Sequence, residues 1–164
     1  MIVKNDKMEK VCSFYVSDFH LEMILMPFIN QKIDKKENIV IKTEYDLENS
    51  LETLLSKMNL KSENKEKIFD LGWNKDKDKN IKDGSNVIII GSKNYIENIN
   101  SELEQHKFTD ITVVDCYKFN EIEKNMNEIV SKYDGNLNTS GFIEKNSKKS
   151  WNIYKVVVKC NKLY

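Results

Sequence analysis

NVIIIGS, residues 86–92, is the stretch that constrains the fold most strongly. Its four consecutive aliphatic side chains, Val87 to Ile90, leave no position for a polar residue that faces water. Such runs are typical of strands that a parallel sheet buries on both faces. Gly91 ends the run, and Ser92 favours the start of a helix, because its hydroxyl accepts a hydrogen bond from a free backbone N–H. The stretch therefore predicts a central strand of a parallel sheet followed at once by a helix.

The same order of strand and helix recurs along the chain. Runs rich in β-branched and aromatic residues predict three more strands, at residues 11–16, 39–43 and 111–114. Apolar residues at helical spacing predict helices at residues 19–33, 46–58 and 63–71, in the segment after Ser92, and at residues 119–133. Parallel neighbours in a sheet need such crossover helices. We therefore expect an α/β fold of three αβα layers, with a mostly parallel, doubly wound sheet of four to five strands.

Three segments interrupt this regular order. Pro27 lies inside the first predicted helix, where proline removes a backbone hydrogen bond, so a kink or a break into two short helices is expected. Residues 134–141 begin with Asp-Gly and end with Gly, which predicts a loop. Residues 152–160 alternate apolar side chains with lysine, which predicts a last strand at an edge of the sheet, parallel or antiparallel to its neighbour. All elements fit one domain, residues 1–164, with its core in residues 11–134.

The composition limits the possible partners. No apolar stretch approaches the roughly 20 residues of a membrane-spanning helix, and residues 1–10 lack the features of a secretory signal, so we expect a cytoplasmic protein without a membrane span. The 26 basic residues are all lysine. Nucleic-acid binding is therefore not favoured, because arginine supplies the bidentate contacts on which such binding commonly depends. Strong AT bias in the coding DNA would also explain the absence of arginine.

Gly91, Ser92 and Lys93 are the best candidates for ligand binding. Ligands of open parallel sheets bind beyond the carboxyl ends of the strands, and these residues follow the predicted central strand. The first N–H groups of a helix bind phosphate or carboxylate, and glycine permits close approach of the anion. The alternative is a simple turn, since neither GxGxxG nor GxxxxGK[ST] is present.

Four residues expected near the same edge of the sheet are candidates for catalysis. Asp18 and Asp115 follow predicted strands and could hold a magnesium ion, although capping of the next helix is the simpler interpretation. His20 and Cys116 could form a base and nucleophile pair, although a buried histidine near a structural cysteine is simpler. The three cysteines of the chain include no CxxC pair, so neither a zinc site nor a disulfide framework is expected.

No motif in the sequence names a reaction, a cofactor or a ligand. The absence of a recognisable set of nucleophile, base and orienting group favours a non-catalytic or regulatory module that binds a protein partner or a small anionic ligand at the carboxyl ends of its strands. The alternative is a small enzyme acting on a phosphorylated or nucleotide substrate through Asp18, Ser92, Lys93 and Asp115, with or without a divalent metal. Convergence of these four side chains on one pocket would favour the enzyme, and their separation would favour the module.

Overall fold

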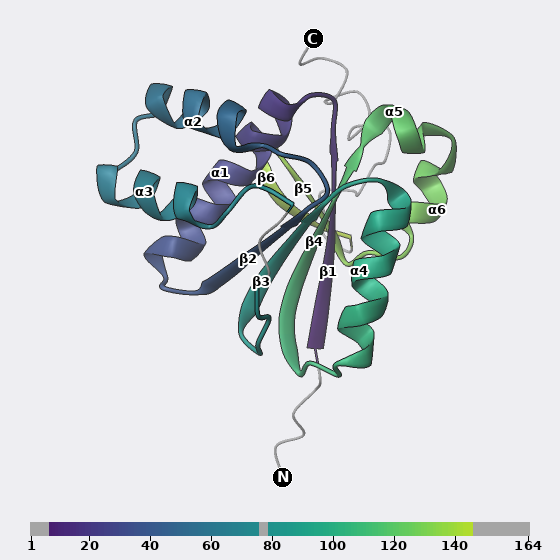
Figure 1. Cartoon of the computed structure of the whole chain (residues 1–164). Coiled ribbons are helices and arrows are strands. Elements are labelled where there is room, and N and C mark those ends of the chain that lie inside the picture. Colours follow the sequence, from purple (N-terminus) through teal and green to yellow (C-terminus); the bar gives the residue numbers. More distant parts are fainter. Residues whose placement is uncertain (1–6, 76–78, 146–164) are drawn as a thin grey trace.

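The computed structural model describes residues 7–75 and 79–145, and these ranges contain one six-stranded sheet. In chain order the strands are β1 (Lys7–Tyr15), β2 (Asn38–Thr43), β3 (Ser85–Ile90), β4 (Asp110–Lys118), β5 (Gly135–Asn138) and β6 (Gly141–Glu144). They lie in the order β2-β3-β4-β1-β5-β6 (Figure 1). All neighbours are parallel except β5 and β6. The predicted α/β class and mostly parallel sheet are confirmed, with six strands in place of four to five.

Strand β3 is an interior strand, as its aliphatic run predicts. It pairs in parallel with β2 on one side and with β4 on the other, and all its residues are buried. Val87 and Ile89 join the core on one face of the sheet, whereas Ile88 and Ile90 join the core on the other face. Burial on both faces is therefore the reason why this segment has no polar alternation.

Helices cover both faces of the sheet, which gives the three expected layers. In chain order they are α1 (Asp18–Asp34), α2 (Glu48–Lys57), α3 (Ser62–Asp70), α4 (Lys93–Gln105), α5 (Phe119–Ile122), the 3-10 turn η1 (Glu123–Asn125) and α6 (Met126–Val130). Figure 1 shows α1, α2 and α3 on one side of the sheet and α4, α5 and α6 on the other. Each set packs on its own hydrophobic cluster. None of the described helices has the length and hydropathy needed to cross a bilayer.

Helix α1 passes through Pro27 without a break, so of the two expected outcomes, a kink or a division into two helices, the division is wrong. Pro27 is exposed, and so is Met23, one turn earlier, whose carbonyl would have bonded to the missing N–H. The lost hydrogen bond therefore lies on the side of the helix that water reaches. On the opposite side, fully buried Leu25, Met26 and Ile29 hold both halves of α1 against the sheet.

The C-terminal part of the described chain differs from its prediction in two ways. Residues 119–133 do not form one helix but the three short turns α5, η1 and α6. Residues 134–141 are not simply a loop, because Gly135–Asn138 is strand β5, and Gly141 begins β6. A Cβ atom at Gly135 would come within 2.3 Å of the Phe142 ring, so the hairpin needs glycine there. The strand predicted at residues 152–160 lies outside the described residues.

Candidate functional site

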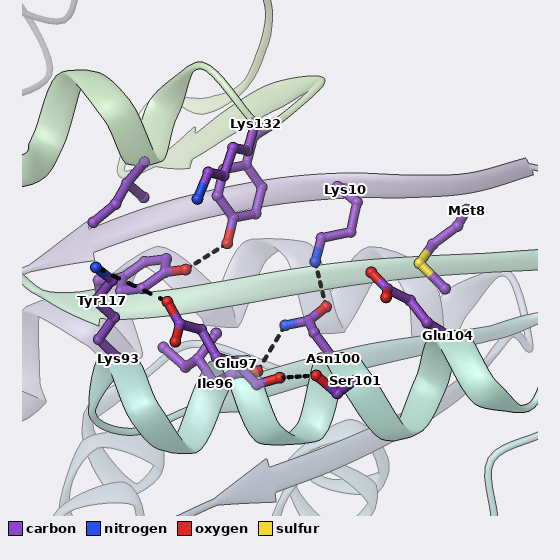
Figure 2. Close-up of a pocket in the computed structure, with 12 residues that line it drawn as sticks. Met8, Lys10, Lys93, Ile96, Glu97, Asn100, Ser101, Glu104, Tyr117 and Lys132 are labelled. Carbon is purple, nitrogen blue, oxygen red and sulfur yellow. Dashed lines mark hydrogen bonds and ion pairs between the residues drawn. The ribbon is translucent and has the colours of Figure 1, made fainter.

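A groove of about 510 Å³ lies on the face of the sheet that α4 covers (Figure 2). It is lined by side chains of β1, the end of β4, α4, α6 and the residues after α6. The crossover from β4 to β5 passes this face as three short turns and ends its last turn at Val130. Met8 and Lys10, in the first half of β1, line the groove. The groove therefore lies between the first half of β1, helix α4 and the end of this crossover.

A buried carboxylate lies beneath this groove and is bonded to residues that line it. Asp115 lies in the middle of β4, opposite Cys12 of β1, and its side chain has no exposed surface. The Lys10 Nζ lies 3.2 Å from its Oδ2 atom, and the Tyr133 hydroxyl donates to the same oxygen at 2.5 Å. The Asn100 amide donates to both carboxylate oxygens, at 3.1 and 3.0 Å. Asp115 is therefore a fully bonded buried acid and not a residue at the strand end, as the sequence suggested.

Lys10 and Asn100 hold each other in place beside the carboxylate. The Lys10 ammonium also donates to the Asn100 Oδ1 atom, and the Asn100 amide nitrogen donates to the Ile96 carbonyl at 2.9 Å. Lys10 lies over the Tyr133 ring, 5.3 Å from its centroid, which favours a cation there. Burial raises the pKa of Asp115 above its ordinary value, while Lys10, Tyr133 and Asn100 oppose that rise. The carboxylate beneath the groove is thus held by three residues from separate parts of the chain.

Two tyrosines connect this carboxylate to the groove. The Tyr117 and Tyr133 hydroxyl oxygens are 2.6 Å apart, and the dashed line from Tyr117 in Figure 2 marks this bond. Burial raises the pKa of both hydroxyls, so both keep their protons at neutral pH. A chain of hydrogen bonds therefore runs from Tyr117, which lines the groove, through Tyr133 to Asp115.

Cationic side chains gather at one end of the groove. Figure 2 shows Lys93, Tyr117 and Lys132 together at this end, which we call the lysine end, with Met8 and Glu104 at the other. Lys93 is the first residue of α4, where the helix dipole is positive, and within the described residues it forms a loose ion pair with Glu97 at 3.9 Å. Lys132 is exposed and forms no ion pair with any residue that the structure describes. The lysine end therefore offers positive charge to a ligand.

The structure places the predicted anion site, Gly91 to Lys93, at the start of α4, but one of the chain's own carboxylates occupies it. Ser92 caps the helix by accepting a hydrogen bond from the Tyr95 backbone N–H at 3.3 Å. Its own N–H donates to the Glu44 carboxylate at 2.8 Å. A Cβ atom at Gly91 would lie 2.5 Å from the Tyr95 ring. The glycine thus admits a tyrosine side chain, and of the three residues Lys93 alone lines the groove.

The catalytic candidates do not converge. Asp18 is exposed at the start of α1, on the opposite side of the sheet from the Asp115 network. The His20 Nδ1 atom accepts a hydrogen bond from the Val16 backbone N–H at 3.0 Å, and burial lowers the pKa of His20. Cys116 is fully buried within β4, where burial raises the pKa of its thiol. Both residues are described, and no hydrogen bond joins them.

The sequence interpretation missed most of the groove. Lys10, Asn100, Lys132 and Tyr133 lie in predicted helices or just before a predicted strand, where lysine, asparagine and tyrosine are ordinary surface or packing residues. The one available signal was Asp115, an acid between Val114 and Cys116 in an apolar run. A buried acid of this kind needs a cation nearby, but the sequence does not say which of 26 lysines supplies it.

The described residues contain no group of three His, Cys, Asp or Glu side chains placed to hold a metal ion. Comparison of the chain with models of protein families, with curated proteins and with solved structures finds no match, so its function is inferred from its own side chains.

Proposed function

We propose that this protein is a non-catalytic ligand-binding module and that its groove binds a small anion at the lysine end. The observation that carries this proposal is the exposed Lys132, which has no ion-pair partner among the described residues and stands with Lys93 at one end of the groove. The volume of about 510 Å³ lies within the range of small-molecule sites. Lys93 lies just after β3 and Tyr117 is the last residue but one of β4, so this end of the groove adjoins the carboxyl ends of those strands, where the sequence analysis expected the ligand.

The charges of the groove support an anion at one end only. Lys10 is neutralised by Asp115, and Glu104 lies away from the lysine end (Figure 2). The Lys93 Nζ lies 3.9 Å from the Glu97 Oε1 atom, which is a loose ion pair, and both side chains are about half exposed. Such an exposed pair contributes little and is readily exchanged for a ligand. The positive charge that remains is that of Lys132, reinforced by the start of α4.

The enzyme alternative has less support, because its four residues lie apart. Lys93 and the partners of Asp115 meet at the groove, but neither Asp18 nor Ser92 lines it. Asp115 itself has no exposed surface through which to touch a substrate. The arrangement therefore favours binding over the proposed reaction on a phosphorylated substrate.

The test is a measurement of anion binding by thermal shift and calorimetry, with inorganic phosphate and ethyl phosphate as probes. A ligand that binds the native state raises the melting temperature. We expect Lys132→Gln to weaken binding about fivefold, since one charge-assisted hydrogen bond at a partly exposed site contributes about 1 kcal/mol. Lys124→Gln is the matched control, because Lys124 is an exposed lysine of η1 that does not line the groove. Equal loss of binding in both variants, or no binding of either probe to the unmodified protein, would rule out the proposed site.

A further inference from the structure

The direction of the hydrogen bonds below the groove follows from the atoms that can only donate a hydrogen bond. The Lys10 ammonium and the Asn100 amide nitrogen are donors only, and both donate to the Oδ2 atom of Asp115. The orientation of the Asn100 amide is fixed, because its oxygen faces the Lys10 ammonium and its nitrogen faces the Ile96 carbonyl. The Oδ2 atom therefore acts as an acceptor.

This acceptor determines where both tyrosine protons point. The Tyr133 hydroxyl lies 2.5 Å from the Oδ2 atom, so its single proton is donated to Asp115. The proton between the Tyr133 and Tyr117 oxygens, which are 2.6 Å apart, must then belong to Tyr117. Tyr117 has no second proton. Its oxygen is left with lone-pair capacity beside the groove that it lines.

We infer that the groove selects anions that also carry a hydroxyl or amino group, because Tyr117 can accept a hydrogen bond from the ligand but cannot donate one. This inference rests on the proposed function and adds a second contact to it. The anionic group, a phosphate or carboxylate, lies at Lys132 and Lys93, and the donor group of the same molecule lies at Tyr117 (Figure 2). The Tyr117 side chain is only 5% exposed. A ligand that fills the groove without a donor would leave the lone pair of the tyrosine oxygen without a hydrogen bond, which is unfavourable.

The test compares phosphate monoesters that share a two-carbon chain and differ in the group at its end. The probes are ethyl phosphate, 2-hydroxyethyl phosphate and 2-aminoethyl phosphate, measured by calorimetry with the full chain. We expect the hydroxyl and amino probes to bind about fivefold more tightly than ethyl phosphate, the effect of one hydrogen bond. Tyr117→Phe should remove this difference, so that 2-hydroxyethyl phosphate binds no more tightly than ethyl phosphate. Tyr45→Phe is the control, since Tyr45 is a half-buried tyrosine that packs on the other hydrophobic cluster.

A second variant tests the direction of the bonds and does not depend on Tyr117→Phe folding well. Tyr133→Phe removes the oxygen that receives the Tyr117 proton, so Tyr117 becomes able to donate. The variant should bind 2-methoxyethyl phosphate, which can only accept, about fivefold more tightly than the unmodified protein does. If the unmodified protein binds ethyl and 2-hydroxyethyl phosphate equally, the inference is wrong and the proposed function stands. If it binds none of the probes, both are wrong.

Discussion

Replacement of Lys10 by methionine should destabilise the protein in a way that depends on pH. Methionine keeps most of the aliphatic length of lysine but removes the cation beside Asp115, whose side chain has no exposed surface. Loss of one partner of a buried ion pair typically costs about 3–5 kcal/mol. Lys10 is 22% exposed, and Tyr133 and Asn100 still bond to the carboxylate. We therefore expect a loss below that range, about 2–3 kcal/mol near neutral pH.

The sign of the pH dependence follows from the state of Asp115. Lys10 opposes the rise that burial produces in the pKa of this carboxyl, so its removal raises the pKa further. At low pH the carboxyl is protonated with or without Lys10, and the two proteins differ only in packing. As pH rises, the unmodified protein keeps a compensated charge, whereas the variant must bury an uncompensated one or hold a proton at a cost of about 1.4 kcal/mol per pH unit. The difference in unfolding free energy should therefore increase with pH.

The assay is urea unfolding of both proteins between about pH 4 and about pH 8, together with thermal melts. For a chain of this size, 2–3 kcal/mol corresponds to a fall in melting temperature of roughly 5–10 °C. The double variant Lys10→Met/Asp115→Asn should recover part of the loss, because it removes the buried charge as well. A destabilisation that is constant with pH, or that shrinks as pH rises, would show that Lys10 does not compensate Asp115.

Three further predictions concern residues outside the groove. Gly91→Ala should destabilise the protein by about 1–3 kcal/mol, because its Cβ would lie 2.5 Å from the Tyr95 ring. Adding Tyr95→Ala should reduce that loss in a double-mutant cycle, and full additivity of the two losses would contradict the clash. Burial raises the pKa of the Cys12 thiol to about 12 and that of Cys116 well above its ordinary value, so iodoacetamide near pH 8 should modify neither in the native state and both in urea, as peptide mass spectrometry would show. Burial also raises the pKa of Glu22, so the contribution of this residue to stability is complete below the ordinary value of 4.5 and is lost as pH rises. In urea titrations, the unfolding free energy of Glu22→Gln should equal that of the unmodified protein in acid and exceed it by up to about 1 kcal/mol at neutral pH. A lower stability of the variant at neutral pH would refute this reasoning.

The layers of the fold could be predicted from the sequence, because in these elements the local residue pattern agrees with the burial that the fold imposes. Val87 to Ile90 form an unbroken aliphatic run and lie in an interior strand. Ser17 and Ser92 precede helices, and both accept hydrogen bonds from the first turn, as their positions suggest. In these places the residue type that favours a structure and the environment that the fold provides are the same, so local inference succeeds.

The groove could not be found in this way, because it depends on pairing between distant parts of the chain. Aspartate is uncommon in strands, so the sequence suggested that β4 ends at Asp115, whereas the strand continues to Lys118. Only the register of β1 beside β4 brings Lys10 near that carboxylate. Likewise, Gly135–Asn138 has little intrinsic preference for a strand and becomes one by pairing with β1. Tertiary contacts override local preference at these positions.

At the broken crossover of α5, η1 and α6, a change that increases stability would also remove the binding site. A single long helix in its place would pack over Met8 and Lys10 and bury apolar area that now faces the groove. Such a redesign would raise the melting temperature and abolish the binding of phosphate esters together. Variants selected for thermal resistance alone should therefore accumulate larger side chains along this part of β1 and lose their ligand first.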